Sequence, residues 1–273
     1  MPFIFKTKDI LNKLNSAIIE KNPFSMIRFG DGGLKMMYSI YHQNKENIKI
    51  IGEKEGIPYE NMKYIITLWA KYANTADFID TPSIYDGIKF WKRYKKGITP
   101  INCRTQLLLN NWKNVYSKAG ISTEFRQYCN PEFNWLSILN NPLNLLNIMK
   151  NKKICFISIF DNISNLSGYD IKYVKIVNHY ENHFKNSFSD TITYIEENVN
   201  KYDLWLNSSG ELGRIYSGRI KELGGRVLDM GFVAQYWNNL ERPLRFSKFM
   251  EIDKKNPLQL QLTKSGLRYK DYI

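Results

Sequence analysis

A glycine-rich turn with a single carboxylate follows the first strong apolar run of the chain. Within SMIRFGDGGLKMM, residues 25–37, Asp31 is set among Gly30, Gly32 and Gly33. Glycines at the end of a parallel strand let backbone N–H groups approach an anion, and the helix that follows adds the positive end of its dipole. A carboxylate in such a turn can hold a divalent cation, Mn²⁺ or Mg²⁺, that bridges a diphosphate. The alternative is an aspartate that bonds its own backbone in an Asx turn.

A second strand-to-helix junction offers similar chemistry. NSSGELGR, residues 207–214, contains the hydroxyls of Ser208 and Ser209, then Gly210 and Glu211. We expect the two serines to donate to an anion and to cap the helix that follows. Neither junction matches G-x-G-x-x-G or G-x-x-x-x-G-K-[ST], which argues against a plain dinucleotide site or a P-loop. An ordinary capped turn is the alternative for this junction taken alone.

Alternating strands and helices must position these junctions. Short apolar runs predict strands at 24–29, 152–158, 172–177, 202–207 and 226–231. Helical spacing or composition predicts helices at 33–42, 58–73, 129–149 (broken at Pro142), 191–201 and from Gly210 to the pair Gly224-Gly225. Strands and helices that alternate in this way indicate βαβ units. The sequence therefore predicts an α/β protein with a Rossmann-like, mostly parallel sheet flanked by helices.

The chain shows no internal repeat and no low-complexity linker. We therefore expect residues 1–273 to form a single α/β domain. Its N-terminal half would be 1–150, its C-terminal Rossmann-like half 151–240, and its basic tail 241–273. No apolar run approaches the ~20 residues of a membrane span. The N-terminus also lacks the apolar region of a signal peptide, so we expect a cytoplasmic protein.

Basic residues are concentrated in two segments. The chain has 39 Lys or Arg against 26 Asp or Glu, a formal net charge of +13. Nine of the basic residues lie between Lys89 and Arg126, and eight lie from residue 241 onward. Such patches attract phosphorylated substrates, nucleic acid and anionic lipid headgroups. A solvated helix face that keeps the protein soluble is the alternative for each of them.

The cysteines and histidines favour neither a disulfide framework nor a zinc site. Cys103, Cys129 and Cys155 form no C-x-x-C pair, so buried free thiols are expected. His179 and His183 have the i, i+4 spacing that can bind zinc on one helix face, but the HExxH pattern is absent. We expect them to be ordinary exposed or core histidines.

The two junctions together resemble the bacterial GT-D-type glycosyltransferases. In that family an Arg-aromatic-Gly-Asp-Gly-Glu motif follows a strand, as SMIRFGDGG does here at Arg28 and Phe29. The stretch YDLWLNSSGELGRIYSGRIKELGGRVLDMGFVAQYW resembles the closing strand–helix–strand unit of the family. The likeness covers about residues 24–45 and 152–240. It implies the GT-D fold and transfer from a nucleotide-diphosphate sugar to a surface glycan, a glycoprotein or a lipid-linked acceptor.

The resemblance also implies roles for particular residues. The family's Asp and Glu form a DxE pair that holds a metal ion and the nucleotide diphosphate. Arg28, Gly30, Asp31 and Gly32 match the motif, which makes Asp31 the implied metal ligand. Gly33 stands where the family has Glu. Arg28 would orient Asp31 or contact phosphate, with a structural salt bridge as its alternative.

Three arrangements would compensate for the missing carboxylate. Asp31 would hold the metal with water and phosphate oxygens alone. Alternatively, Glu211 or Asp229 would supply a second carboxylate from the other junction. In the third arrangement, Arg and Lys side chains would neutralise the diphosphate in place of a metal.

A transferase that inverts configuration also needs a base for the acceptor hydroxyl. Asp161, Glu132 and Asp229 are the candidates, and the sequence does not rank them. Phe232, Ala234 and Gln235 occupy the region where the family tends to carry further acidic residues.

Two other classes of function compete with the transferase. The first is a nucleic-acid-binding or RNA-modifying protein, suggested by IKFWKRYKKG at 88–97, although no RRM, KH or zinc-finger signature is present and no specific nucleic acid is expected. The second is an inactive family member that acts as a binding subunit, suggested by Gly33. The basic excess also fits peripheral contact with an anionic membrane on its inner face.

Overall fold

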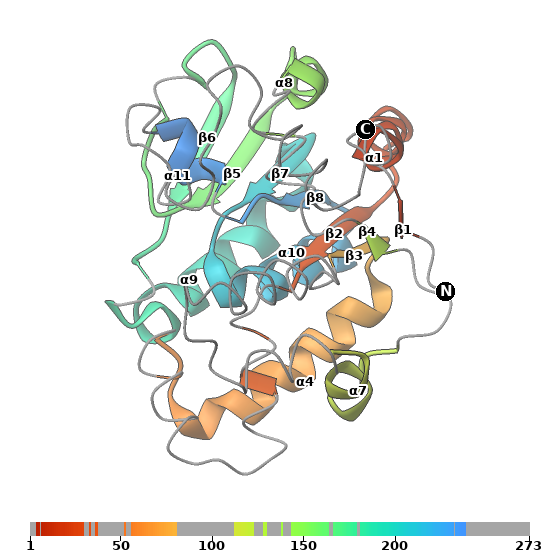
Figure 1. Cartoon of the computed structure of the whole chain (residues 1–273). Coiled ribbons are helices and arrows are strands. Elements are labelled where there is room, and N and C mark those ends of the chain that lie inside the picture. The colour runs from red at the N-terminus through yellow and green to blue at the C-terminus, as the bar shows by residue number, and fades with distance from the viewer. Residues whose placement is uncertain are drawn as a thin grey trace, which may run out of the picture.

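The computed structural model describes residues 4–5, 7–29, 33, 36–37, 52, 56–80, 112–122, 128–129, 138, 143–163, 166–178, 181–231 and 233–238. Within them, a single sheet contains eight strands in the order β1-β4-β3-β2-β8-β7-β5-β6, and each neighbouring pair is parallel (Figure 1). The strands are β1 (Ile4–Phe5), β2 (Phe24–Arg28), β3 (Phe78–Asp80), β4 (Tyr128–Cys129), β5 (Ile154–Ser158), β6 (Ile171–Lys175), β7 (Leu204–Asn207) and β8 (Arg226–Asp229). The predicted parallel α/β sheet is confirmed.

Two groups of four strands join in the middle of this sheet. Strands β1 to β4 come from the first half of the chain and β5 to β8 from the second, and β2 pairs with β8 where the groups meet. Met26 of β2 lies opposite Leu228 of β8 in the register. This pairing places the carboxyl end of β2 beside that of β8.

Helices cover both faces of the sheet, as Figure 1 shows. They are α1 (Thr7–Glu20), α4 (Tyr59–Thr75), α7 (Trp112–Lys118), α8 (Leu143–Met149), α9 (His183–Asn198), α10 (Gly213–Glu222) and α11 (Val233–Asn238). Side chains of α4, α7, α9 and α10 form one buried cluster, and those of α1, α8 and α11 form another. Strand β5 supplies both, since Cys155 faces the first cluster and Phe156 the second. Cys155 is a buried free thiol, as expected.

Two of the predicted helices differ from the structure. Residues 128–129 form strand β4, so the predicted helix at 129–149 is wrong at its start, whereas α8 begins at Leu143, directly after Pro142. The helix predicted at 191–201 begins earlier, at His183, because the side chain of Asn182 accepts a hydrogen bond from the backbone N–H of Lys185 and caps it. The buried ring of His183 lies 3.1 Å from the Tyr216 hydroxyl, the core role expected for it.

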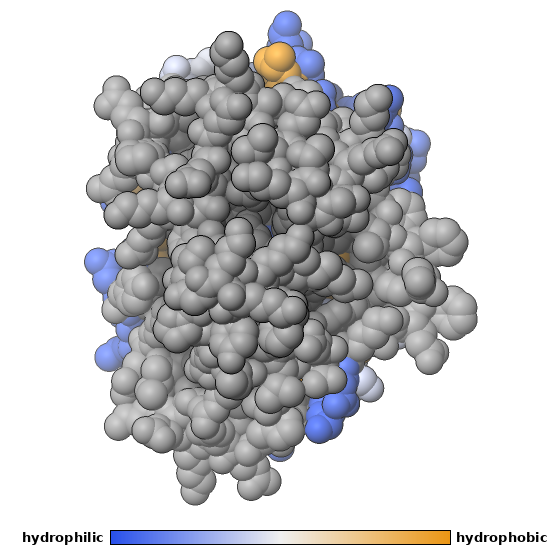
Figure 2. All heavy atoms as spheres, in the orientation of Figure 1, coloured by the Kyte–Doolittle hydropathy of each residue, from blue (hydrophilic) through white to orange (hydrophobic). Residues whose placement is uncertain are grey.

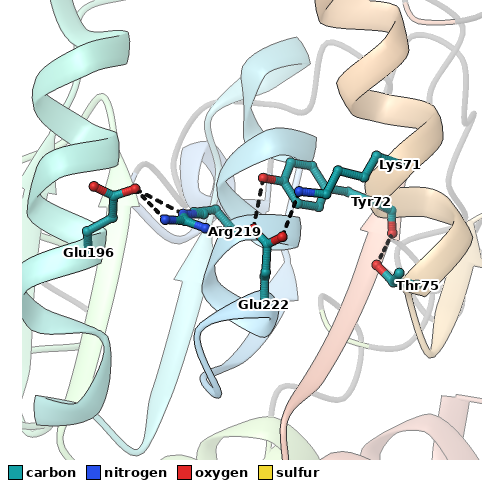
Figure 3. A network of polar contacts seen from close by, with 6 residues as sticks. All are labelled: Lys71, Tyr72, Thr75, Glu196, Arg219 and Glu222. Carbon is teal, nitrogen blue, oxygen red and sulfur yellow. Dashed lines mark hydrogen bonds and ion pairs between the residues drawn. The ribbon is translucent and has the colours of Figure 1, made fainter.

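Charged side chains fix α10 between its two neighbouring helices. Arg219 of α10 donates to Glu196 of α9 at 2.7 and 3.0 Å and to Glu222 at 2.7 Å. Glu222 also accepts from Lys71 of α4 at 2.6 Å and from the Tyr72 hydroxyl at 3.3 Å. Figure 3 shows this network bridging the three helices. The network therefore ties α10 to both neighbouring helices.

The network predicts a pH-dependent stability. Hydrogen bonding from Lys71 is the main cause that lowers the pKa of Glu222 below its usual value of 4.5. A carboxyl group with a depressed pKa contributes stability that is present above its unfolded pKa and is lost as the pH falls through the folded pKa. We expect Glu222→Gln to lower the melting temperature at pH 7 by about 1–3 °C, since exposed ion pairs contribute about 0.2–1 kcal/mol. The difference from wild type should shrink as the pH falls below 4.5, the usual pKa of the carboxyl group, and a difference that stays constant on acidification would contradict the assignment.

The described surface carries few exposed apolar side chains. Large hydrophobic residues are exposed at Ile19, Tyr59, Tyr64 and Leu143. On the face drawn in Figure 2, the coloured residues are mostly hydrophilic. In the described part of the chain, no helix is long and apolar enough to span a membrane.

Candidate functional site

The candidate site lies at the carboxyl ends of β2, β8 and β7. These strands end at Arg28, Asp229 and Asn207, and Asn207 lies opposite Asp229 in the register. In open parallel sheets, ligands bind at this edge, at the point where two halves of the sheet diverge. The β2–β8 pair joins the two halves, so the expected place for a ligand coincides with the ends of these strands.

A buried carboxylate connects β8 to β2. One oxygen of Asp229 accepts the backbone N–H of Arg28 at 3.3 Å, and the other accepts that of Gly231 at 2.9 Å. Burial raises the pKa of the Asp229 carboxyl above its usual range, while the positive charge of Arg28 opposes that rise. The Arg28 guanidinium lies against Gly231, where a Cβ atom would come within 2.7 Å of its Nε and Cζ. Gly231 also has a φ of +52°, so a glycine is required there on both counts.

The hydroxyl groups of the second junction are used inside the turn. Ser208 donates to the backbone carbonyl of Gly231, and Ser209 donates to the side-chain oxygen of Asn207. Neither serine caps a helix, because the short 3₁₀ turn Gly210–Leu212 comes between them and α10 and has no side-chain cap. The expected capping role is therefore wrong, and anion binding by these serines stays a prediction. Gly210, the first residue of the 3₁₀ turn, has a φ of +62°, a backbone conformation that favours glycine.

Asn207 holds the start of α10 at the sheet edge. Its buried amide nitrogen donates to the Gly213 carbonyl at 2.6 Å and to the Ser217 hydroxyl at 2.8 Å. Gly213 has no side chain for a physical reason, since a Cβ atom would lie 2.9 Å from that amide. The end of β7 and the first turn of α10 therefore form one rigid unit.

The first turn of α10 carries a buried arginine. Arg214 is 3% exposed, and its guanidinium carbon lies 4.8 Å from the ring centre of Phe29 and 4.6 Å from that of Trp69. Its Nη1 forms an ion pair with Glu211, whose side chain is 12% exposed. Its Nε is buried and has no hydrogen-bond partner among the described residues. An unsatisfied buried donor costs about 1–3 kcal/mol, so this guanidinium is held at a cost.

Gly33 brings the two junctions together. A Cβ atom on Gly33 would lie 2.8 Å from Nη2 of Arg214 and 3.1 Å from a carboxylate oxygen of Glu211. A side chain at this position would therefore displace the arginine. The two motifs, almost 180 residues apart in sequence, form one cluster, in which Arg28, Asp229, Glu211 and Arg214 are the described charged groups.

The other predicted site residues lie elsewhere or outside the described residues. Asp161 follows β5, about 14 Å along the sheet edge from β2 by strand spacing. It is exposed, and hydrogen bonding from Lys175 at 3.3 Å lowers the pKa of its carboxyl, which makes it a weaker base. Four predicted residues, namely Gly30, Asp31, Gly32 and Glu132, lie outside the described residues.

The described residues do not by themselves form a metal cage. Position 33 faces an arginine, Glu211 is paired with that arginine, and both oxygens of Asp229 accept backbone hydrogen bonds. Across the described ranges, no group of three His, Cys, Asp or Glu side chains could hold a metal ion. These described carboxylates are therefore a poor fit for a divalent cation.

Three of these residues were missed from the sequence. Arg214 stands within the NSSGELGR stretch, and its i, i+3 spacing from Glu211 is the one signal that could have identified it. Asn207 resembles any polar residue at a strand end. Trp69 resembles any core residue of an amphipathic helix, and nothing in its own segment indicates an arginine partner.

Comparison with known proteins gives a likeness of fold. No family model and no curated protein matches the sequence. A solved structure described as the highly conserved domain of unknown function 1792, with a distinct glycosyltransferase fold, is 14% identical; the match covers 88% of this chain and 82% of that one, with a TM-score of 0.56. A structure described as a new glycosyltransferase (DUF1792) from Streptococcus sanguinis is 13% identical over 88% and 85% of the two chains, with a TM-score of 0.54.

A third structure of this domain type, in selenomethionine form, gives 14% identity over 86% and 85% of the chains and a TM-score of 0.52. At such identities the likeness concerns the fold alone. The chain therefore has the fold described for these domains as a glycosyltransferase fold, which confirms the expected fold class.

Proposed function

We propose that the protein is a glycosyltransferase that moves a sugar from a nucleotide-diphosphate sugar to a hydroxyl group of a glycan, a glycoprotein or a lipid-linked acceptor. One observation carries the proposal. In a chain with a glycosyltransferase fold, two glycine-containing junctions meet around the buried Arg214 and the partly buried Arg28 at the carboxyl edge of a parallel sheet. Backbone N–H groups and guanidinium groups at this edge are suited to bind the diphosphate of a donor.

Transfer of a sugar from a nucleotide-diphosphate donor requires three functions of the site. The bond between the anomeric carbon and the diphosphate oxygen breaks, and a bond from that carbon to the acceptor oxygen forms. The nucleoside diphosphate leaves with the bonding electron pair, and the acceptor proton passes to a base. The site must therefore neutralise the leaving diphosphate, hold the acceptor in line and accept one proton.

Three described residues and Asp31 can be assigned to these tasks. Arg28 would contact phosphate and, through its backbone N–H, hold Asp229 in place. Asp229 is our candidate for the base, since burial raises its pKa and makes it a stronger base than an ordinary aspartate. Asp31 would bind the ribose or a cation at the diphosphate, and Mn²⁺ or Mg²⁺ stays a proposal there. Phe29, directly after β2, packs edge-on against Trp69, with 6.1 Å between the ring centres.

We also propose a cytoplasmic protein that makes peripheral contact with the anionic inner face of a membrane. The net charge of +13 supports this, because basic side chains are attracted to anionic lipid headgroups. Lipid-linked acceptors would be bound at the same surface. Co-sedimentation with liposomes should rise with the content of anionic lipid and fall with added salt. Binding that ignores lipid charge would contradict the contact, and tight salt-dependent binding of RNA alone would favour the nucleic-acid alternative.

A thermal-shift panel tests the donor site. We expect one of UDP, GDP, CMP and dTDP, tested with and without Mn²⁺, to raise the melting temperature of the wild type by about 2–6 °C at 100 times its Kd. The rise should be lost in Asp31→Ala. Asp190→Ala is the matched control, since Asp190 is an exposed carboxylate on α9, away from the sheet edge.

Two results would count against the transferase. Absence of a shift with every nucleotide would remove the donor site. A specific shift without turnover of any nucleotide sugar would favour an inactive binding subunit.

A further inference from the structure

We propose that the buried guanidinium of Arg214 is the cationic subsite for the diphosphate, with Glu211 as its resident counter-anion when the site is empty. The diphosphate takes the place of the Glu211 carboxylate, and the chain neutralises the leaving group with an arginine rather than with a carboxylate-held metal ion. This inference rests on the proposed function and names the group that performs one of its tasks.

Burial and packing single out Arg214 among the basic residues of α10. Arg219 and Lys221 on the same helix form hydrogen bonds with acceptors at the protein surface. Arg214 instead lies between two aromatic rings with its Nε unpartnered. A planar guanidinium tolerates such a place because it stacks on rings and is weakly hydrated. The aromatic rings fix its plane, and a fixed fork of N–H donors is what bidentate phosphate recognition needs.

Gly33 and Glu211 complete the surroundings of this guanidinium. Nη2 faces Gly33, which has no side chain to displace the guanidinium. Nη1 is occupied by Glu211. The Glu211 side chain is 12% exposed against 3% for Arg214, so the ion pair meets solvent on the Glu211 side. Exchange of this carboxylate for a stronger anion would begin from that side.

Charge balance also identifies Glu211 as the carboxylate that a diphosphate can replace. Among the described groups at this edge, Arg28 and Arg214 face Asp229 and Glu211. Asp229 is fixed by two backbone N–H groups and cannot turn away without losing both bonds. Among the described residues, Arg214 alone donates a hydrogen bond to the Glu211 carboxylate. Of the two carboxylates, Glu211 is therefore the one that another anion can replace.

Removing the Glu211 charge should raise the affinity for a diphosphate, and altering Arg214 should lower it. Glu211→Gln keeps the side-chain shape and removes the competing charge, so we expect inorganic pyrophosphate and the preferred nucleoside diphosphate to bind about 3- to 10-fold more tightly in EDTA. Arg214→Lys should weaken binding by about 10-fold or more, since a lysine cannot reproduce the fork. If Glu211 were instead a metal ligand, Glu211→Gln would weaken binding, and EDTA would abolish it in the wild type.

Matched controls lie on the same helix. Glu222→Gln and Arg219→Lys make the same chemical changes in the surface network and should leave affinity within about twofold. If Arg214→Lys fails to fold, Glu211→Gln/Arg214→Met removes both charges of the ion pair together and should still lose pyrophosphate binding. Calorimetric titration in EDTA and in Mn²⁺, with melting temperatures recorded alongside, measures all of these.

The outcomes separate the inference from the proposed function. Binding that requires Mn²⁺ and is lost in Glu211→Gln overturns the arginine subsite and leaves the transferase standing. Metal-free pyrophosphate binding that needs Arg214, with no nucleotide sugar consumed, supports the subsite and overturns the transferase. Absence of any diphosphate binding with or without Mn²⁺ overturns both.

Discussion

Replacing Asp229 by asparagine is expected to lower sugar transfer by about 100-fold or more, in line with the loss of a general base. The carboxylate is 5% exposed and accepts the backbone N–H groups of Arg28 and Gly231. An asparagine can accept one of these bonds but must turn its NH₂ group toward the other donor. The substitution therefore removes the proton acceptor and disturbs the join between β2 and β8.

The pH profile distinguishes a base from a residue that only organises the site. Burial raises the pKa of Asp229 above its usual 3.8, so the group becomes protonated at a higher pH than an ordinary aspartate. A base works in its deprotonated form. The wild-type kcat/KM should therefore fall as the pH drops through that raised pKa. In Asp229→Asn the residual activity should lack this acidic limb.

Two further variants sharpen the comparison. Asp161→Asn replaces the rival candidate, which is exposed and paired with Lys175, and we expect a change of less than about threefold. Asp190→Asn removes an exposed carboxylate from α9 and serves as the control. Similar losses in Asp161→Asn and Asp229→Asn, or an acidic limb that survives in Asp229→Asn, would contradict the assignment of the base.

The second large effect concerns stability. Gly218→Ala is expected to destabilise the protein by about 3 kcal/mol, the upper end for an overpacked core, and to lower the melting temperature by about 5–10 °C. Gly218 lies where α10 crosses α4, and a Cβ atom there would lie 2.0 Å from Cγ and 2.2 Å from Cβ of Tyr72. The clash involves the root of the tyrosine side chain, which cannot move without shifting helix α4.

Thermal unfolding measures this effect against a glycine that has space. Gly168→Ala is the control, because a Cβ atom there has no neighbour within 4 Å. Adding Tyr72→Ala to Gly218→Ala should recover part of the loss, giving a coupling of about 1 kcal/mol or more in a double-mutant cycle. Equal melting temperatures for the Gly168 and Gly218 variants would show that the two helices can separate freely, contrary to the packing described.

The strongest local signals in the sequence were sufficient for most of the long elements. Apolar runs such as ICFIS and LWLN predict buried strands because both faces of a parallel sheet are covered, and β5 and β7 are buried throughout. Strands β1, β3 and β4 were missed. They contain two or three residues, too few for any periodicity, and exist because neighbouring strands pair with them. The same pairing made residues 128–129 a strand where helix was expected.

The chemistry of the site was partly determined by the sequence. The glycines around Asp31 and the NSSG turn predict two places where backbone N–H groups can approach an anion, because glycine at the end of a parallel strand allows such an approach. Glu211 and Asp229 were named as carboxylates of the second junction, and the structure places both in one cluster with Arg28 and Gly33.

The tertiary structure alone decided which groups meet. Strand β2 pairs with β8, about 200 residues later in the chain, and this pairing sets Gly33 against Arg214 and Glu211. Strand order is a global choice that depends on the packing of the whole sheet, so no local pattern near either motif encodes it. For the same reason the sequence shows Gly33 only as a missing carboxylate. In the folded protein, the absence of a side chain at Gly33 leaves the space that the Arg214 guanidinium occupies.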